Sequence, residues 1–152
     1  MFQKSIKAIL VLSLLFLMTG CSWKNEPLVK EQGNSEQESY VYKNADLGFT
    51  ITLPKDFNHY EVQRKNLGDK TDVEFYVLTS DQTFVTDFKG FGKIMTIRVA
   101  SNEAGSDGFV NLTKTKDKFY FVKFWEAAPE DWKERFNNEF KKELTSSFKL
   151  ND

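Results

Sequence analysis

The sequence predicts one α+β domain, an antiparallel sheet of about six strands with a C-terminal helix packed on one face. Two patterns predict this class. Through most of residues 47–125, apolar residues alternate with polar ones, which is the period of a strand. Near the C-terminus, large apolar residues recur at every fourth position, which is typical of an amphipathic helix. A chain of 152 residues suffices for one such domain, which we expect over residues 40–152.

Six segments share the strand period: residues 47–53, 60–62, 73–78, 95–99, 109–113 and 118–125. Pro54 stops the first segment, because proline has no N–H to donate to a sheet. The third segment is apolar on both faces towards its end, whereas the fourth is apolar on one face only. The last two flank a short polar stretch and predict a hairpin.

One long helix is predicted near the C-terminus. Pro129 suits its first position, and Glu130 and Asp131 suit its positive N-terminal end. Its apolar stripe would consist of Trp132, Phe136, Phe140 and Leu144. A second, short helix is predicted over residues 80–89, where the phenylalanines have helical spacing.

The N-terminus has the pattern of an export signal. Lys4 and Lys7 precede an uncharged apolar run of 11 residues, which is too short to span a membrane. The letters LMTGC that follow resemble the lipobox of bacterial lipoproteins. The resemblance implies cleavage between Gly20 and Cys21 and a lipid on Cys21, which would anchor an extracytoplasmic protein to the membrane. An ordinary secretory signal with an incidental cysteine is the alternative.

The segment after the cysteine predicts a tether. Residues 21–39 are polar, have no helical or strand period, and are rich in Glu, Gln, Ser and Asn. Such a composition is typical of disorder. We expect the tether to hold the domain clear of the bilayer.

Two stretches of the domain resemble one known family. DLGFTITLPKDF at residues 46–57 is similar to the opening of PsbP-like domains, and EDWKERFNNEFKKELTSSFKL at residues 130–150 is similar to their last helix and terminal strand. The resemblance implies an antiparallel sheet with helices on its faces, and a role in binding or assembly. It brings no functional residue of the family to this chain.

The composition offers little catalytic chemistry. One cysteine excludes an intrachain disulfide, one histidine excludes a multi-histidine site, and a net charge of -1 argues against nucleic-acid binding. His59 is the one conventional general base, and we interpret it as a loop histidine. The carboxylate pairs Glu130/Glu134 and Glu139/Glu143 are interpreted as solvated helix positions, and residues 90–92 as a glycine-punctuated turn. No metal and no cofactor is expected.

The aromatic strand at residues 118–125 supplies the candidate binding residues. Phe119, Phe121 and Trp125 point to one face, and Tyr120, Val122 and Phe124 point to the other. Either both faces are covered, or one is partly open and binds a partner.

These features together predict a non-enzymatic binding or assembly module, with an envelope protein as its partner. The alternative is a carrier of a small apolar ligand between sheet and helix, and an enzyme is the third hypothesis.

Overall fold

The computed structural model describes residues 39–84, 88–105 and 108–151, so the export signal and the tether lie outside the described residues. The described strands are β1 (Ser39–Asn44), β2 (Phe49–Pro54), β3 (Tyr60–Asn66), β4 (Lys70–Leu78), β5 (Phe91–Ala100), β6 (Val110–Lys114), β7 (Phe119–Phe124) and β8 (Lys149–Leu150). The helices are the 3-10 turns η1 (Lys55–Phe57), η2 (Glu103–Gly105) and η3 (Glu130–Trp132), and the α-helix α1 (Asn138–Ser147).

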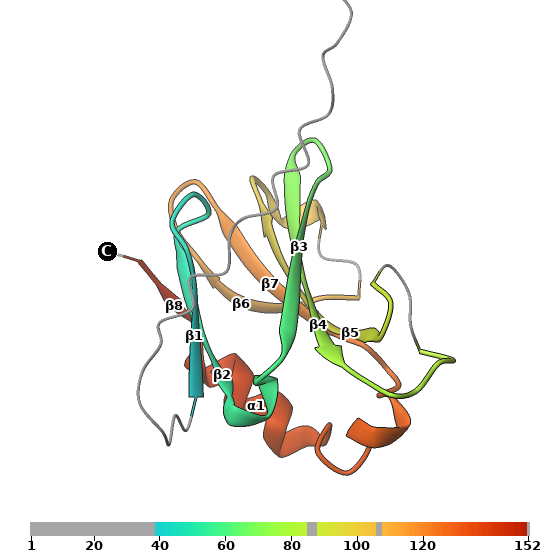
Figure 1. Ribbon diagram of the computed structural model, residues 1–152. Coiled ribbons are helices and arrows are strands. Elements are labelled where there is room, and N and C mark those ends of the chain that lie inside the picture. The colour runs from blue at the N-terminus through green and yellow to red at the C-terminus, as the bar shows by residue number, and fades with distance from the viewer. Residues whose placement is uncertain (1–38, 85–87, 106–107, 152) are drawn as a thin grey trace, which may run out of the picture.

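The strands form two antiparallel sheets, which are shown in Figure 1. The smaller has the order β1-β2-β8, and the larger has the order β3-β4-β5-β7-β6. The predicted α+β class with antiparallel strands and a C-terminal helix is therefore confirmed. The prediction of a single sheet of about six strands is wrong, because the described chain has eight strands divided between two sheets.

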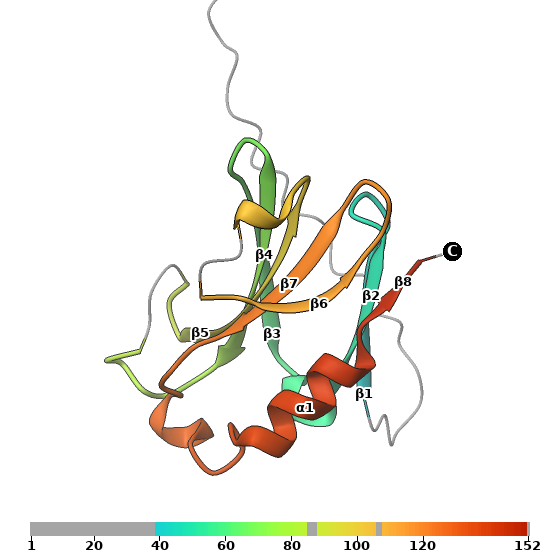
Figure 2. The same cartoon turned by 180° about the vertical axis from the view of Figure 1, so that it is seen from behind.

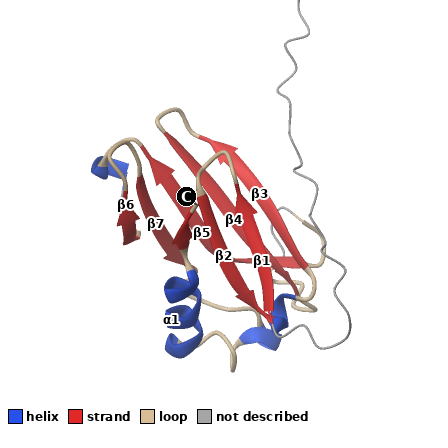
Figure 3. Cartoon of the chain, turned by 90° about the vertical axis from the view of Figure 1, so that its left-hand side faces the viewer, coloured by secondary structure: helices blue, strands red, loops and turns tan. Residues whose placement is uncertain are grey.

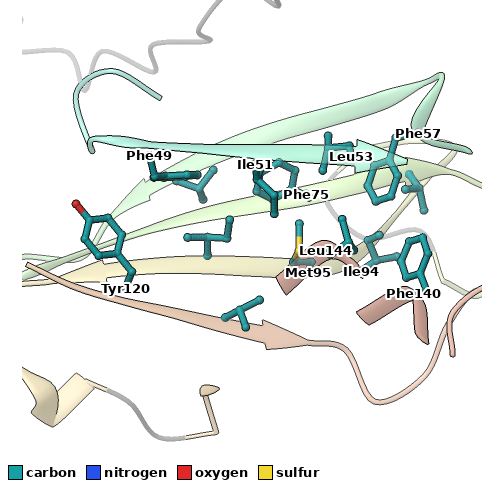
Figure 4. Close-up of a cluster of buried hydrophobic side chains, with 14 of the residues drawn as sticks. Phe49, Ile51, Leu53, Phe57, Phe75, Ile94, Met95, Tyr120, Phe140 and Leu144 are labelled. Carbon is teal, nitrogen blue, oxygen red and sulfur yellow. The ribbon is translucent and has the colours of Figure 1, made fainter. Parts of the chain in front are cut away.

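The two sheets pack face to face around one core. Phe49, Ile51 and Leu53 of β2 point inward and are almost completely buried, while the threonines between them lie on the other side of the strand. Across the core they face the larger sheet, including Phe75 of β4 and Met95 of β5 (Figure 4). Side chains from the two inner faces thus fill the space between the sheets, as in other sheet-on-sheet packings.

The predicted long helix is interrupted. Residues 130–132 form the 3-10 turn η3, and α1 begins only after Asn137, whose side chain accepts a hydrogen bond from the Phe140 N–H at 3.0 Å. Asn137 is therefore an N-cap, which starts a new helix. All four residues of the predicted stripe are nevertheless buried in the core. Figure 2 shows α1 across one end of the two sheets.

Two further expectations between β4 and β5 are corrected. The described residues between 80 and 89 form turns, not a short helix, and their backbone N–H groups donate hydrogen bonds to the Thr79 and Asp81 side chains. Gly90 lies in a turn with φ +82°, but Gly92, predicted to lie in the same turn, belongs to β5. A Cβ on Gly92 would lie 2.7 Å from a ring carbon of Phe84, so close packing requires glycine there.

No helix among the described residues has the length and apolar character needed to cross a membrane.

Candidate binding surface

The side of the five-stranded sheet that faces away from the core, here called the outer face, carries most of the polar chemistry of the fold. Along β4, Asp72, Glu74 and Tyr76 alternate with core residues and therefore lie on this face. The register places Arg98 of β5 beside Asp72, and Phe121 of β7 beside Arg98. Asp72, Glu74, Tyr76 and Phe121 are all buried although they lie on the outer side of the sheet.

Glu74 is the centre of a hydrogen-bonded group that joins three strands. Its carboxylate lies 2.8 Å from the Lys65 Nζ of β3 and 2.8 Å from the Lys93 Nζ of β5. The Tyr76 hydroxyl donates to the same carboxylate at 2.7 Å. Burial alone would raise the pKa of Glu74, but these three donors hold the pKa below its ordinary value. Glu74 therefore stays ionised and fixes the Lys93 side chain.

A second ion pair occupies the middle of the outer face. Arg98 donates to both carboxylate oxygens of Asp72, at 2.7 and 2.8 Å, and these hydrogen bonds raise the pKa of the guanidinium. The Phe109 ring covers Arg98, with the guanidinium carbon 4.0 Å from the ring centroid. This two-point contact on a rigid sheet is structural, because both charged groups are already satisfied by each other.

The structure places the three predicted binding residues at different depths. Phe119 is half-buried and stacks on Phe121, with centroids 6.4 Å apart, whereas Phe121 itself is only 2 % exposed. Trp125, which is 40 % exposed, follows the other end of β7. Phe119 and Trp125 are six positions apart, which is a distance of about 20 Å along a strand. The three residues share a side of the sheet but do not form one patch.

Trp125 belongs to an apolar cluster that the sequence analysis did not identify. Its ring lies under the Lys93 ammonium, 4.6 Å from the centroid. Leu78, 48 % exposed, stands opposite Phe91 at the end of the β4–β5 pair, and Phe88 packs edge-on against Tyr76. We call Leu78, Phe88, Phe91, Lys93 and Trp125 the Trp125 patch. The signal in the sequence was Leu78, an apolar residue at the end of β4 on the same side as the polar residues Asp72 and Glu74.

The loop that leads from β4 to Phe88 is fastened to η3 by two carboxylates. Asp131 accepts hydrogen bonds from the Thr79 hydroxyl at 2.6 Å and from the Ser80 N–H at 2.9 Å. Asp81 accepts one from the Thr83 hydroxyl at 2.6 Å and one from the Glu130 N–H at 3.0 Å. Burial acts to raise the pKa of Asp131, but its hydrogen bonds outweigh burial and lower it. The pKa of Asp81 is lowered chiefly by the bond from Thr83.

The other candidate residues do not converge on a site. His59 is exposed beside β3, and its carbonyl accepts a backbone hydrogen bond from Leu78. Glu130 lies in η3, apart from the Glu139/Glu143 pair on α1, and all three are exposed. Within the described ranges, no group of three or more potential metal ligands is found. Cys21 and Gly20 lie outside the described residues.

One hollow lies between α1 and the sheets. It has no room for a molecule as large as water. Its lining is almost entirely apolar and consists of Ile51, Met95, Ile97, Leu112, Val122, Phe124, Leu144, Thr145 and Phe148. This space is a packing defect of the core rather than a preformed ligand cavity.

Comparison with known proteins adds no assignment. No protein-family model, no curated protein and no solved structure matches this chain.

Proposed function

We propose that this chain is an extracytoplasmic bacterial lipoprotein, anchored through Cys21, whose domain is a non-enzymatic module that docks an envelope protein at the Trp125 patch. The observation that carries the docking site is the exposure of two large apolar side chains, Trp125 and Leu78, on the outer face. The lipobox-like LMTGC and the polar tether support the anchor. An anchored, tethered domain meets membrane partners at high effective concentration.

The chemistry of the Trp125 patch suits a protein partner. Protein interfaces concentrate their binding energy in a few aromatic residues and cations, surrounded by less important contacts. Here Trp125 provides the aromatic anchor, and Lys93 is held over the ring because Glu74 fixes its ammonium at 2.8 Å. A side chain already fixed in its bound geometry loses little entropy on binding, so the patch is preorganised.

The PsbP-like resemblance supports the same role. The two stretches that carry it become neighbours in the fold, because β2 pairs with β8 at residues 49–50 and 149–150. Of the three predicted binding residues, only Trp125 belongs to the proposed docking surface, because Phe121 is 2 % exposed and Phe119 lies at the other end of β7. The carrier hypothesis gains no support from the hollow beside α1, since a ligand would have to open it.

Site-specific photo-crosslinking in intact cells tests the proposal. A photoreactive residue at position 125 should give a discrete protein adduct. The same residue at position 41, where Val41 is 59 % exposed on the smaller sheet, is the matched control and should give none. Leu78→Ala should weaken the adduct at position 125, while Val110→Ala, at a site 64 % exposed on β6, should leave it unchanged. Equal adducts from positions 125 and 41 would refute the docking site.

A further inference from the structure

The β6–β7 hairpin is a basic part of the fold. Residues 108–125 contain four lysines and one aspartate, a net charge of +3, whereas the whole chain has a net charge of -1. The helical segment 130–147 contains five acidic and four basic residues, a net charge of -1. In Figures 1 and 2 the tip of the hairpin and α1 lie at opposite ends of the domain. The net positive charge of the hairpin and the net negative charge of the helical segment are therefore separated along the domain.

Three of the hairpin lysines are available to a partner. Lys114 is 65 % exposed and lies 4.0 Å from Glu103, which is equally exposed, so water screens this pair strongly. Lys116 and Lys123 are exposed, and within the described part of the chain neither lies in an ion pair. The fourth, Lys118, differs because its ammonium donates to the carbonyls of Asp46 and Leu47.

Aromatic rings lie between these cations. The Lys114 ammonium is 5.9 Å from the Phe119 centroid, and the Lys123 ammonium is 5.9 Å from the Phe109 centroid. Both phenylalanines are half-buried. Lysines around partly exposed rings match the interface of an anionic membrane, where the ammonium groups meet phosphates and the rings lie at the headgroup level. Edge pairing with another strand is disfavoured, because β6 is short, bulged and ends in a lysine (Figure 3).

We infer that Lys114, Lys116, Phe119 and Lys123, here called the basic edge, rest on the anionic lipid headgroups of the membrane to which the chain is anchored. This inference relies on the anchor of the proposed function and assigns the domain a preferred orientation. Each lysine near an anionic surface contributes only weakly, but the tether keeps the bilayer within reach and makes the association intramolecular. The Trp125 patch borders the basic edge at Lys123, because Trp125 follows two residues later on the same side of β7.

Lysine footprinting on vesicles tests this orientation. Residues 21–152 contain one cysteine, so a maleimide lipid couples the chain to a vesicle through Cys21, whether or not cells lipidate it. Amine acetylation is then followed by mass spectrometry on phosphatidylcholine vesicles and on vesicles with one third phosphatidylglycerol. We expect acetylation of Lys114, Lys116 and Lys123 to slow by about threefold or more on the anionic vesicles, and high salt to restore it. The exposed Lys55, Lys142 and Lys149 are internal controls whose rates should not change.

Three results would overturn the inference. The first is equal acetylation on both kinds of vesicle, and the second is equal slowing of all six lysines. The third is equal protection by soluble polyglutamate on neutral vesicles, which would assign the basic edge to an acidic protein instead of lipid. Because coupling is chemical, these results are independent of whether Cys21 is lipidated in cells.

Charge reversal gives a second readout. The chain with its cysteine blocked should sediment with phosphatidylglycerol vesicles at low salt, and Lys114→Glu, Lys116→Glu and Lys123→Glu together should abolish this. The matched triple variant Lys55→Glu, Lys142→Glu and Lys149→Glu has the same net charge and should retain most of the sedimentation. Equal loss in both variants would show attraction by net charge alone and would refute the basic edge.

Discussion

At the scale of single residues, the Glu74 carboxylate connects the three strands β3, β4 and β5 on the outer face. Lys65, Lys93 and Tyr76 all donate to it. Removing one member of a buried ion pair leaves a desolvated charge without a partner, which costs more than losing an exposed pair. The position of Lys93, and hence that of the Trp125 ring, depends on this carboxylate.

We therefore expect Glu74→Gln to lower the free energy of unfolding by about 2–3 kcal/mol, because it leaves the Lys93 ammonium without its counter-charge. Asp46→Asn is the matched control. It removes the exposed ion pair between Asp46 and Arg64, whose nitrogen and oxygen lie 3.1 Å apart, and should cost less than about 1 kcal/mol. Urea unfolding of both variants measures the difference. Equal midpoints would mean that the Glu74 group contributes no more than a surface pair.

The second prediction at this scale concerns the anchor. Cys21→Ala removes the only thiol in the chain and should abolish lipidation, so the protein should leave the membrane fraction. Labelling cells with a fatty-acid analogue measures this directly. A serine substitution at the adjacent Gly20 keeps the thiol and a small residue, and it should retain the label. Undiminished label on Cys21→Ala would contradict the lipobox interpretation.

Only part of the candidate site could be predicted from the amino-acid sequence. The alternation along β7 correctly placed Phe119, Phe121 and Trp125 on one side, because the period of a strand is a local property. Their exposures were not predictable, since Phe109 and Phe88, which lie on the outer face, come from segments outside β7. The ion pairs of the outer face depend on the register between strands, which a single strand does not reveal.

At the scale of elements, the C-terminal segment shows how a cap divides a helical pattern. The four-residue spacing from Trp132 to Leu144 predicted which side chains are buried, but the helix boundary depends on Asn137. Asparagine is a good N-cap and a poor interior helix residue, so its presence in the middle of the pattern was an available signal. Packing accommodates the break because the 3-10 turn keeps Trp132 directed at the core, where its indole donates to the Leu78 carbonyl at 3.0 Å.

We expect Phe136→Ala to destabilise the domain by about 3–5 kcal/mol, because it removes a buried ring that packs against Phe124 and Phe140. Asn137→Ala, one residue further, removes only the cap and should cost about 1 kcal/mol. Denaturant unfolding of the two variants measures the separation. An unchanged midpoint for Phe136→Ala would show that this side chain contributes nothing to the core.

The loop between β4 and Phe88 should open in acid. Asp81 and Asp131 have lowered pKa values in the folded protein, so their contribution to stability is present above the unfolded pKa, near 4, and is lost as the pH falls through the lower folded values. Amide exchange of residues 79–84 should therefore accelerate below about pH 4 and change little between pH 5 and 7. Asp131→Asn should give the fast exchange already at neutral pH, and Glu134→Gln, an exposed carboxylate nearby, should not. A pH-independent exchange rate in the wild type would contradict this role of the two carboxylates.

At the scale of the whole molecule, the core alone should suffice for folding. We expect residues 39–152 to unfold in one cooperative transition without ligand or metal, because one continuous hydrophobic cluster joins both sheets and α1. Thermal unfolding with and without a chelator measures this. A chelator that removes the transition would reveal a metal requirement.

The division into two sheets was beyond the sequence. Alternation identifies strands but not their partners, and β1 was missed because its short YVY motif gives too few alternating positions. The pairing of β2 with β8 brings together residues about one hundred positions apart, as in the hydrogen bond between Thr50 and Asn151 at 2.6 Å. Such contacts depend on the tertiary fold, and local propensity does not contain them.

This pairing has a consequence for biosynthesis. During synthesis β1 and β2 emerge long before β8, and until residues 149–151 arrive the edge of β2 at residues 49–50 has no partner strand. Asn151 then caps the small sheet, because its backbone N–H donates to Gly48 and its side chain donates to Asn44 and Phe49. The nascent chain therefore passes through a state in which this part of the β2 edge is exposed. When residues 149–151 arrive, they pair with residues 49–50 and end the period in which this part of the edge is open to misassembly.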